Sequence, residues 1–540
     1  MIKPLFRILF VAITLSSSVS VLSAQDNTNF GAKEYLRYRD YNRALFQLLK
    51  LEEKYPNDLY VLENIGICYL NINTDRSKAL PYLKKVYNAG NYKDEILLYL
   101  GIASMHAHNF DEAITFFEEF KKISGNMYPD DVELYINNCE NAKALIKAPK
   151  NVAFINLGKN INTKYPEFLP FVTSNQDVLY FTSGREANLK KIESSEGFFT
   201  TDIYYSNVRE GQWMRARGMR RVNTIEDEQC VYISPDGNNM IIYLDNNKEY
   251  GDIFLSTKPS NSRGFTIPKP LGEPANSKYL EMQGTIFGEG TRLIVSSNRP
   301  GGQGGLDLYL FRKLPDGSWG LPVNLGENIN TKYGEAYPSY DEKNKILYFA
   351  SQGHTNMGGY DIFKSKFDEE TQTFGPAVNM GYPINNTMDN VQFTLAGNKR
   401  DGYMAMYRPE GYGDLDIYKV EFREVEVQLA VIKGVVTMAP DSLNPKELDA
   451  YITISDVTSG KDIEGRSLNP KTGKFVFAVE PGVYKITVDN PGFVTYEKVI
   501  NVYEKSDYVF ENEHNIVLRR PEITVVPGTG QGKVLQEVQE

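Results

Sequence analysis

One glycine-rich stretch of the sequence, SSNRPGGQGGLDLY from Ser296 to Tyr309, has the composition of a loop that could hold a phosphate. Such loops bind anions through backbone N–H groups when glycine and lysine have a set spacing before a helix. Here Asp307 stands where a dinucleotide loop needs its third glycine, and no Gly-Lys pair of the chain is followed by Ser or Thr. The glycines lead into a strand-like phrase, so the sequence favours a tight turn. We expect Gly304 and Gly305 to supply positive backbone φ angles in this turn.

Residues that could act as nucleophiles, bases or metal ligands are few and do not converge. The four histidines belong to no H-E-x-x-H motif, and no G-x-S-x-G motif is present. The three cysteines lack C-x-x-C spacing, and Cys68 and Cys139 fall in helical patterns where buried small side chains are expected. His106 and His108, two residues apart near a helix end, point to different sides and form no metal pair. We therefore expect no catalytic residue, no cofactor, no cofactor-binding residue and no metal site.

The first 24 residues have the features of a secretory signal peptide. They carry Lys3 and Arg7, no acidic residue and the apolar run ILFVAITL, and cleavage is expected after Ala24. No cysteine follows that point directly, and no later run approaches the roughly 20 apolar residues of a membrane-spanning helix. The formal net charge is −10 at pH 7. This acidity argues against a nucleic-acid ligand, which needs a basic face, and the signal predicts an exported protein.

Residues 25–149 show a helical pattern that repeats. Small residues recur at two positions with steps of 34 or 35 residues: Ala44, Ala79 and Ala113 at one, Gly66 and Gly101 at the other. Such a period is typical of tetratricopeptide helix pairs, in which small residues let two helices approach closely. The segment resembles three tetratricopeptide repeats with a capping helix. The resemblance implies a concave surface that binds a peptide segment of a partner, and the alternative is a stack that only rigidifies its neighbour.

A strand phrase made of Asp, an aliphatic and an aromatic residue recurs within residues 150–425. Its five copies start at Asp202, Asp252, Asp307, Asp361 and Asp416, with steps of 50, 55, 54 and 55 residues. Each copy follows a short apolar strand, and five units of about four strands predict a five-bladed β-propeller. The glycine-rich stretch then forms the hairpin between the second and third strands of a blade.

A strand from outside the five copies is expected to close this ring. The phrase INLGKNINTKYPE, from Ile155 to Glu167, nearly repeats VNLGENINTKYGE, which ends the third blade. Because the first copy precedes blade one, we expect VAFINLG to be the outer strand of the last blade, beside the strand near Tyr418. The phrase SNRPGGQGGLDLY resembles the WD40-like PD40 repeat, which implies a propeller. Blade two departs from it with NNKEYGDIF, so its hairpin is expected to be shorter.

Residues 426–519 alternate as in a β-sandwich. The phrases NPKTGKFVFAVEPGVYKITV and PGFVTYEKVI resemble the carboxypeptidase regulatory-like, transthyretin-type domain, which carries no catalytic residue. Residues 520–540 are expected to be a flexible tail. The expected fold class is thus multidomain: an α-helical tetratricopeptide array, a five-bladed β-propeller and a transthyretin-like β-sandwich.

This order of domains resembles the PorE-like periplasmic proteins associated with type IX secretion. Those proteins usually add an OmpA-like domain that grips peptidoglycan, and this chain ends before one could begin, so peptidoglycan contact is not carried over. The resemblance implies a non-enzymatic periplasmic scaffold or adaptor, peripheral to the outer membrane, that docks envelope proteins through the helical groove and the propeller face. The alternatives are a propeller-based envelope hydrolase or lyase and a carbohydrate-binding module.

Overall fold

The computed structural model divides into two compact units, residues 1–424 and residues 425–540. It describes residues 27–125, 129–193, 197–245, 251–260, 264–398, 400–423, 430–439, 448–457, 460–479, 482–502, 512–521, 523–524 and 533–534. The expected signal peptide, residues 1–24, and most of the expected tail lie outside these residues, as does most of the blade-two hairpin. Within the described part of the chain, no helix is both long and apolar enough to cross a membrane.

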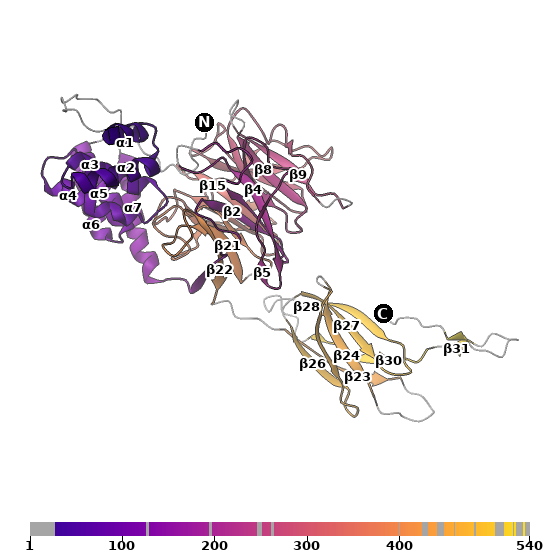
Figure 1. Cartoon of the computed structure of the whole chain (residues 1–540). Helices are drawn as coiled ribbons and strands as arrows, with labels where there is room; N and C mark the ends of the chain where they lie inside the picture. The colour runs from indigo at the N-terminus through magenta and orange to yellow at the C-terminus, as the bar shows by residue number, and fades with distance from the viewer. Residues whose placement is uncertain are drawn as a thin grey trace. The chain divides into compact units, whose positions relative to one another are not determined.

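The first unit opens with a helical array, drawn in indigo and violet in Figure 1. Its elements are α1 (Asn27–Arg37), α2 (Tyr41–Lys54), α3 (Leu59–Asn71), the 3₁₀ helix η1 (Arg76–Lys78), α4 (Ala79–Asn88), α5 (Glu95–His106), α6 (Phe110–Ser124) and α7 (Pro129–Lys147). The carboxylates of Asp40 and Asp58 accept backbone N–H bonds at the starts of α2 and α3. Such caps satisfy N–H groups that the helix itself leaves unpaired. Each α-helix packs on the next along the chain.

Two glycines set the spacing within helix pairs. A Cβ atom on Gly66 of α3 would lie 2.6 Å from the Leu83 side chain of α4. A Cβ atom on Gly101 of α5 would lie 2.4 Å from the Phe117 ring of α6. Real Cβ atoms do not approach neighbours so closely, because interiors are already packed at crystal-like density. The prediction that small residues let paired helices approach closely is confirmed at both positions.

Five antiparallel sheets follow the array. Sheet 1 holds β2 (Glu167–Val172), β3 (Val178–Ser183), β4 (Asp202–Arg209), β5 (Gln212–Trp213) and β6 (Arg217–Gly218). Sheet 2 holds β7 (Asp227–Ile233), β8 (Asn239–Asp245), β9 (Asp252–Thr257) and β10 (Lys269–Pro270). Sheet 3 holds β11 (Glu281–Phe287), β12 (Arg292–Ser297), β13 (Asp307–Arg312) and β14 (Val323–Asn324). Sheet 4 holds β15 (Glu335–Asp341), β16 (Ile346–Ser351), β17 (Asp361–Asp368), β18 (Thr373–Phe374) and β19 (Val378–Asn379). Sheet 5 holds β20 (Phe393–Leu395), β21 (Asp401–Met406), β22 (Asp416–Phe422) and β1 (Val152–Asn156).

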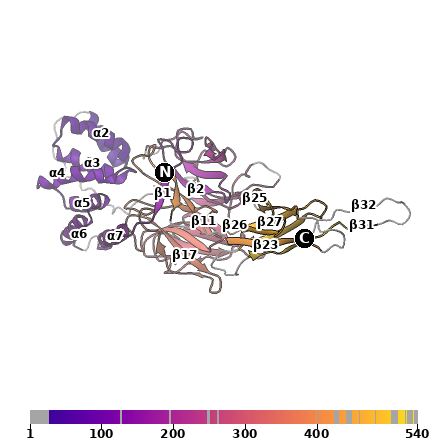
Figure 2. The same cartoon turned by 90° about the horizontal axis from the view of Figure 1, so that it is seen from below.

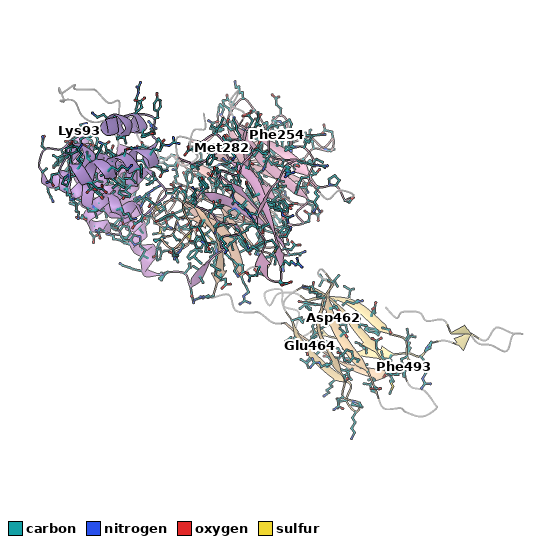
Figure 3. All side chains as sticks on the ribbon, in the orientation of Figure 1. Lys93, Phe254, Met282, Asp462, Glu464 and Phe493 are labelled. Atoms are coloured by element: carbon teal, nitrogen blue, oxygen red, sulfur yellow. The ribbon has the colours of Figure 1, made fainter. Side chains whose placement is uncertain are left out.

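The five sheets contact one another in a ring. Their first strands β2, β7, β11, β15 and β20 each touch the next, and β20 touches β2 again. The main apolar core of the ring includes Met282 of β11, with Phe254 of β9 packed against it (Figure 3). A closed circle of small antiparallel sheets is a propeller-like arrangement, which leaves only short protected edges.

Strand β1 closes the ring. It pairs antiparallel with β22, so that Phe154 lies opposite Val420 and Asn156 lies opposite Tyr418. The Asn156 side chain also donates a hydrogen bond of 2.8 Å to the carboxylate of Asp416. The prediction that a strand preceding sheet 1 completes the last sheet is therefore confirmed.

The second unit, drawn in yellow in Figure 1 and from below in Figure 2, contains two further sheets. One holds β26 (Lys474–Val479), β23 (Ala430–Met438), β29 (Asn512–Glu513) and β30 (Ile516–Leu518). The other holds β25 (Asp462–Ser467), β24 (Tyr451–Asp456), β27 (Gly482–Asp489) and β28 (Tyr496–Val502). Their buried residues, among them Ile432, Phe477 and Ile486, form one apolar core. Two sheets that share one core make a β-sandwich. A small separate pair, β31 (Ile523–Thr524) and β32 (Lys533–Val534), follows.

Candidate functional site

At one end of the ring, the first strand of each sheet begins and a hairpin joins its second strand to its third. We call this end the loop face. An asparagine four to eight residues before the start of each first strand ties neighbouring sheets together there. In sheet 4, Asn330 Oδ1 accepts the Leu308 N–H at 2.8 Å and Nδ2 donates to the Leu308 carbonyl at 3.0 Å. The equivalent residues are Asn162, Asn223, Asn276 and Asn385.

Carboxylates at the strand starts hold the same loops. Glu335 accepts the Thr331 N–H at 2.8 Å, and its other oxygen accepts the hydroxyls of Thr331 and Ser351, each at 2.7 Å. Glu167 and Glu281 repeat these bonds and add an arginine. The arginine–carboxylate distances are 3.0 Å for Arg185–Glu167 and 2.9 Å for Arg299–Glu281. These buried acids are therefore structural, and the repeated spacing Asn-Thr/Ser-x-x-x-Glu was the sequence signal that could have found them.

Glu228, which occupies the same position in sheet 2, departs from this pattern. It lies opposite Leu244, whereas the equivalent glutamates of sheets 1, 3 and 4 each lie opposite a serine. Thr224 binds one of its oxygens, while Oε2 is buried without a hydrogen-bond partner among the described residues. Burial raises the pKa of Glu228 to about 8. Asp202 beside it also has one buried oxygen without such a partner, and burial raises its pKa to about 6.

The five aspartates of the strand phrase start the third strands, as the repeat predicts: Asp202 starts β4, Asp252 β9, Asp307 β13, Asp361 β17 and Asp416 β22. Asp202, Asp307, Asp361 and Asp416 each accept a backbone N–H bond from the loop or hairpin that precedes them, whereas most of the hairpin before Asp252 lies outside the described residues. Asp307 accepts the Gly304 N–H at 3.0 Å, and Asp361 accepts the Met357 N–H at 2.9 Å. Asp307 and Asp361 are thus structural, and the hairpin N–H groups that they bind are not free for a phosphate.

Gly304 and Gly305 do not supply positive φ angles, and that expectation is wrong. Of this hairpin's glycines only Gly301 has one, at 90°. A Cβ on Gly304 would instead lie 1.9 Å from the Tyr333 carbonyl oxygen of the next sheet, whereas Gly305 has no such atom closer than 3.7 Å. Gly358 and Gly413 have the same close approach, at 2.5 Å and 2.4 Å, to carbonyls of the sheets that follow them. Hydrogen at these positions lets one hairpin pack on the next sheet's loop.

The helical array covers part of the loop face. Asn138 of α7 donates 2.7 Å to the carbonyl of Gly358. His106 Nδ1, at the end of α5, lies 3.1 Å from the hydroxyl of Thr387, and burial lowers the His106 pKa. Met357 of a sheet 4 hairpin is fully buried in the apolar core of the array. The helix ends and α7 are thus occupied by the ring, which favours the rigid-stack alternative for that part of the array.

A buried ion pair lies at this contact. The Arg76 guanidinium of η1 is 3.8 Å from Asp389, and both side chains are almost fully buried. Asn73 donates 2.9 Å to Asp414, and burial raises the Asp414 pKa to about 6. Buried charges need such partners, because removing one leaves the other desolvated and uncompensated.

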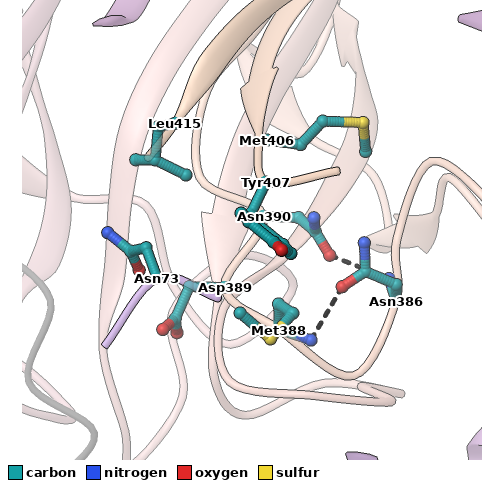
Figure 4. Close-up of a pocket in the computed structure, with 8 residues that line it drawn as sticks. All are labelled: Asn73, Asn386, Met388, Asp389, Asn390, Met406, Tyr407 and Leu415. Atoms are coloured by element: carbon teal, nitrogen blue, oxygen red, sulfur yellow. Dashed lines mark hydrogen bonds between the residues drawn. The ribbon is translucent and has the colours of Figure 1, made fainter. Parts of the chain in front are cut away.

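Asp389 of this ion pair also lines a small pocket (Figure 4). It is lined by Asn73, Asn386, Met388, Asp389, Asn390, Met406, Tyr407 and Leu415. Asp389 Oδ2 and Asn390 Nδ2 have no hydrogen-bond partner among the described residues. The space is about 10 Å³, which is the room of about one water molecule. It is too small for a sugar or a peptide.

The exposed part of the loop face carries three equivalent lysine–tyrosine pairs. Each lysine ammonium lies over the ring of the next residue, at 4.9 Å for Lys164–Tyr165, 5.3 Å for Lys278–Tyr279 and 5.2 Å for Lys332–Tyr333. The lysines are exposed and the tyrosines half-buried. The described residues hold no group of three His, Cys, Asp or Glu side chains placed to bind a metal ion. The cysteines Cys68, Cys139 and Cys230 are buried and unpaired.

No protein-family model matches the sequence, and no curated protein matches it. Solved structures resemble the chain at low identity. One titled a glycoside hydrolase is 8% identical with a TM-score of 0.36, over 52% of this chain and 94% of its own. An α-L-arabinofuranosidase from Lactobacillus brevis is 13% identical with a TM-score of 0.30, over 51% and 93%. Prolyl oligopeptidase B from Galerina marginata is 11% identical with a TM-score of 0.26, over 51% and 33%.

These comparisons correct the main functional expectation, a non-enzymatic scaffold linked to type IX secretion. The structures that resemble the chain are named as hydrolases of glycosides and peptides, which fits the alternative expectation better. With TM-scores of 0.26 to 0.36, these structures assign no particular activity to this chain. Its function has to be argued from its own side chains.

Proposed function

We propose that this chain is a carbohydrate-binding propeller protein. In this proposal the helices are tetratricopeptide repeats, the ring is a five-bladed propeller of the PD40 type, and the second unit is a carboxypeptidase regulatory-like domain. The closed ring of five sheets and the repeat steps of 50 to 55 residues support the finer assignment. The close helix approaches at Gly66 and Gly101 support the tetratricopeptide repeats.

The lysine–tyrosine pairs carry the functional proposal. Tyrosine offers an apolar ring with a polar tip, and the ammonium group offers hydrogen-bond donors, which together suit the mixed faces of a sugar. The pairs occupy the same position in sheets 1, 3 and 4. A repeated contact suits a repeated ligand, because the second and third contacts to one polymer form at high effective concentration.

The proposal also covers export of the chain, its kinship with a known group of proteins, and the proteins that it binds. Residues 1–24 would direct the chain to the periplasm, and the domain order supports kinship with the PorE-like group. Envelope proteins are proposed as further partners of the propeller face and of the helical surface that the ring leaves uncovered.

The triple variant Lys164→Ala, Lys278→Ala, Lys332→Ala tests carbohydrate binding. We expect the wild type to be retarded in affinity gels that contain a bound polysaccharide, and the triple variant to migrate freely. Lys343→Ala, an exposed lysine in the turn between β15 and β16, is the matched control and should bind as the wild type does. Equal retardation of the triple variant, or none for the wild type across neutral and acidic polysaccharides, contradicts the proposal.

A second candidate, a glycoside hydrolase, is favoured by Asp202 and Glu228. Their pKa values of about 6 and about 8 leave one carboxyl ionised and the other protonated at neutral pH, as an acid–base pair requires. Both are buried, so a substrate reaches them only if the loop face opens. The test is release of reducing ends from polysaccharide. Release that Glu228→Gln abolishes without loss of binding supports the hydrolase, and absence of release by the wild type rejects it.

A further inference from the structure

Four arginines lie within seven residues in and beside β6 of sheet 1: Arg215, Arg217, Arg220 and Arg221. All four side chains are exposed. Arg217 belongs to β6, which pairs with β4 on one side and is the outermost strand of the described sheet at that point. Arg215 lies two residues before β6, and Arg220 and Arg221 lie in the turn that follows it; we call these four residues the arginine strip.

Among the described residues, no acidic side chain forms an ion pair with the arginine strip. The acidic residues that flank it in sequence are Glu210 and Glu226. Glu210 lies 3.9 Å from the Arg209 side chain, and Glu226 lies 3.9 Å from the Lys190 ammonium. Within the described part of the chain, none of the four arginines forms an ion pair or a side-chain hydrogen bond. A cluster of four unpaired cations on a chain of net charge −10 is a local site for an anion.

We propose that the arginine strip binds a linear polyanionic carbohydrate, one that carries carboxylate groups along its length. Guanidinium groups bind carboxylates through two parallel hydrogen bonds, and they bind better than lysine wherever that geometry counts. Seven residues of chain span at most about 25 Å, so the Cα atoms of the four arginines lie on one short stretch of the surface. A polymer that carries a carboxylate on each unit can contact several of these arginines at once, because the later contacts form at high effective concentration.

This proposal rests on carbohydrate binding as the function, and it uses a surface separate from the lysine–tyrosine pairs. Failure of the two can therefore be told apart. If only the lysine variant loses binding, the arginine strip is rejected while the proposed function stands. If only the arginine variant loses binding, the proposal of a polyanionic carbohydrate on the arginine strip stands. The proposal that the lysine–tyrosine pairs of the loop face bind carbohydrate is then rejected.

The experiment compares polygalacturonate with its methyl ester, which has the same backbone without the charges. The wild-type chain should bind polygalacturonate and lose affinity as salt rises, because exposed charges are screened. Replacing all four arginines by glutamine should weaken binding roughly tenfold, since each exposed pair contributes a few tenths of a kcal/mol. The matched control changes the same charge elsewhere: Lys50, Lys54, Lys121 and Lys122 to glutamine. It should bind nearly as the wild type does.

Three outcomes overturn the proposal. The first is equal binding of the methyl ester. The second is an equal loss of binding when Lys50, Lys54, Lys121 and Lys122 are changed to glutamine, which would show that net charge alone decides binding. The third is arginine-dependent binding to phosphatidylglycerol vesicles with none to polygalacturonate, which would point to a membrane surface. Replacing the four arginines by lysine keeps the charge and should retain part of the binding, whereas full retention would exclude bidentate recognition. Unchanged thermal melting of each variant shows that the exposed substitutions leave the fold intact.

Discussion

Replacing Gly304 by alanine should destabilise the ring through a contact between two sheets. The new Cβ would lie 1.9 Å from the Tyr333 carbonyl oxygen and 2.5 Å from that of Thr331. The Glu335 carboxylate accepts the N–H and the hydroxyl of Thr331, and the Thr331 hydroxyl accepts the Tyr333 N–H, so this backbone is held in place. The hairpin of sheet 3 must therefore move away from the loop of sheet 4.

The size of the effect follows from that overlap. Forcing one extra carbon into a packed site costs typically 1–3 kcal/mol, and here the obstacle is backbone, so we expect about 3 kcal/mol. The neighbouring hydrogen bond from the Gly305 N–H to the Tyr333 carbonyl, 2.6 Å long, should lengthen as well. Gly305→Ala is the internal control, because its Cβ would lie 3.7 Å from the nearest atom, an ordinary contact. That substitution should cost less than about 1 kcal/mol, the scale of a conformational change without a clash.

The assay is urea unfolding of the full chain, followed by tyrosine and tryptophan fluorescence, with each alanine variant beside the wild type. We expect a lower midpoint for Gly304→Ala and nearly the wild-type midpoint for Gly305→Ala. Gly413→Ala, whose Cβ would meet the Lys164 carbonyl oxygen at 2.4 Å, should behave as Gly304→Ala does. Equal shifts for Gly304→Ala and Gly305→Ala would refute the close-approach reasoning and restore a common backbone cause.

Deleting residues 151–158 removes β1 and should leave the edge of β22 unpaired. Limited proteolysis should then cut the ring at protease concentrations that leave the intact chain uncut. Equal resistance of the two chains would count against closure of the ring by β1. Because the pKa of the Glu228 carboxyl is raised, the folded chain binds this proton more tightly than the unfolded chain does. The free energy of unfolding should therefore fall as the pH rises from about 4.5 to about 8. Glu228→Gln should remove that dependence and unfold at a higher urea concentration than the wild type at pH 9; a parallel pH profile for both proteins would show that the group does not titrate there. Arg76→Met should destabilise the contact between array and ring by about 3–5 kcal/mol, because Asp389 is left as an unpaired buried charge; an unchanged unfolding curve would mean that the pair contributes nothing.

The ring and its closure could be predicted because the relevant signal is repeated text. The five copies of the strand phrase fixed the number of sheets, and the duplicated phrase at Ile155 placed β1 beside β22. The same repetition identified Gly304 as a special position but gave the wrong cause. A positive φ can be guessed from composition, whereas a close approach depends on the carbonyls of Thr331 and Tyr333, which lie in another sheet.

The contact between array and ring could not be predicted from the sequence. Asn138 finds its partner 220 residues away, His106 finds its partner 281 residues away, and Asn73 finds its partner 341 residues away. None of these pairs leaves a periodic trace, because each is a single contact between two unrelated repeats. The departure of Glu228 from its equivalents was also invisible, since the serine that it lacks stands on the neighbouring strand. Sequence repeats predict the features that the five sheets share, whereas these contacts and the Glu228 site occur where one sheet differs from the others.

The pairing of β1 with β22 also bears on how the chain folds as it is made. Asn156 and Tyr418 are about 260 residues apart, so β1 is synthesised long before its partner exists. Bringing such distant segments together carries a large loop-closure entropy and belongs to the slow, late contacts of a fold. Until that pairing forms, the chain exposes an unpaired strand at each end of an open arc. A nascent or truncated chain that stops before Asp416 can therefore form most of the sheets and still lack a closed ring. Pairing of the last 10 or so residues of this unit is thus the step that commits the unit to its native state.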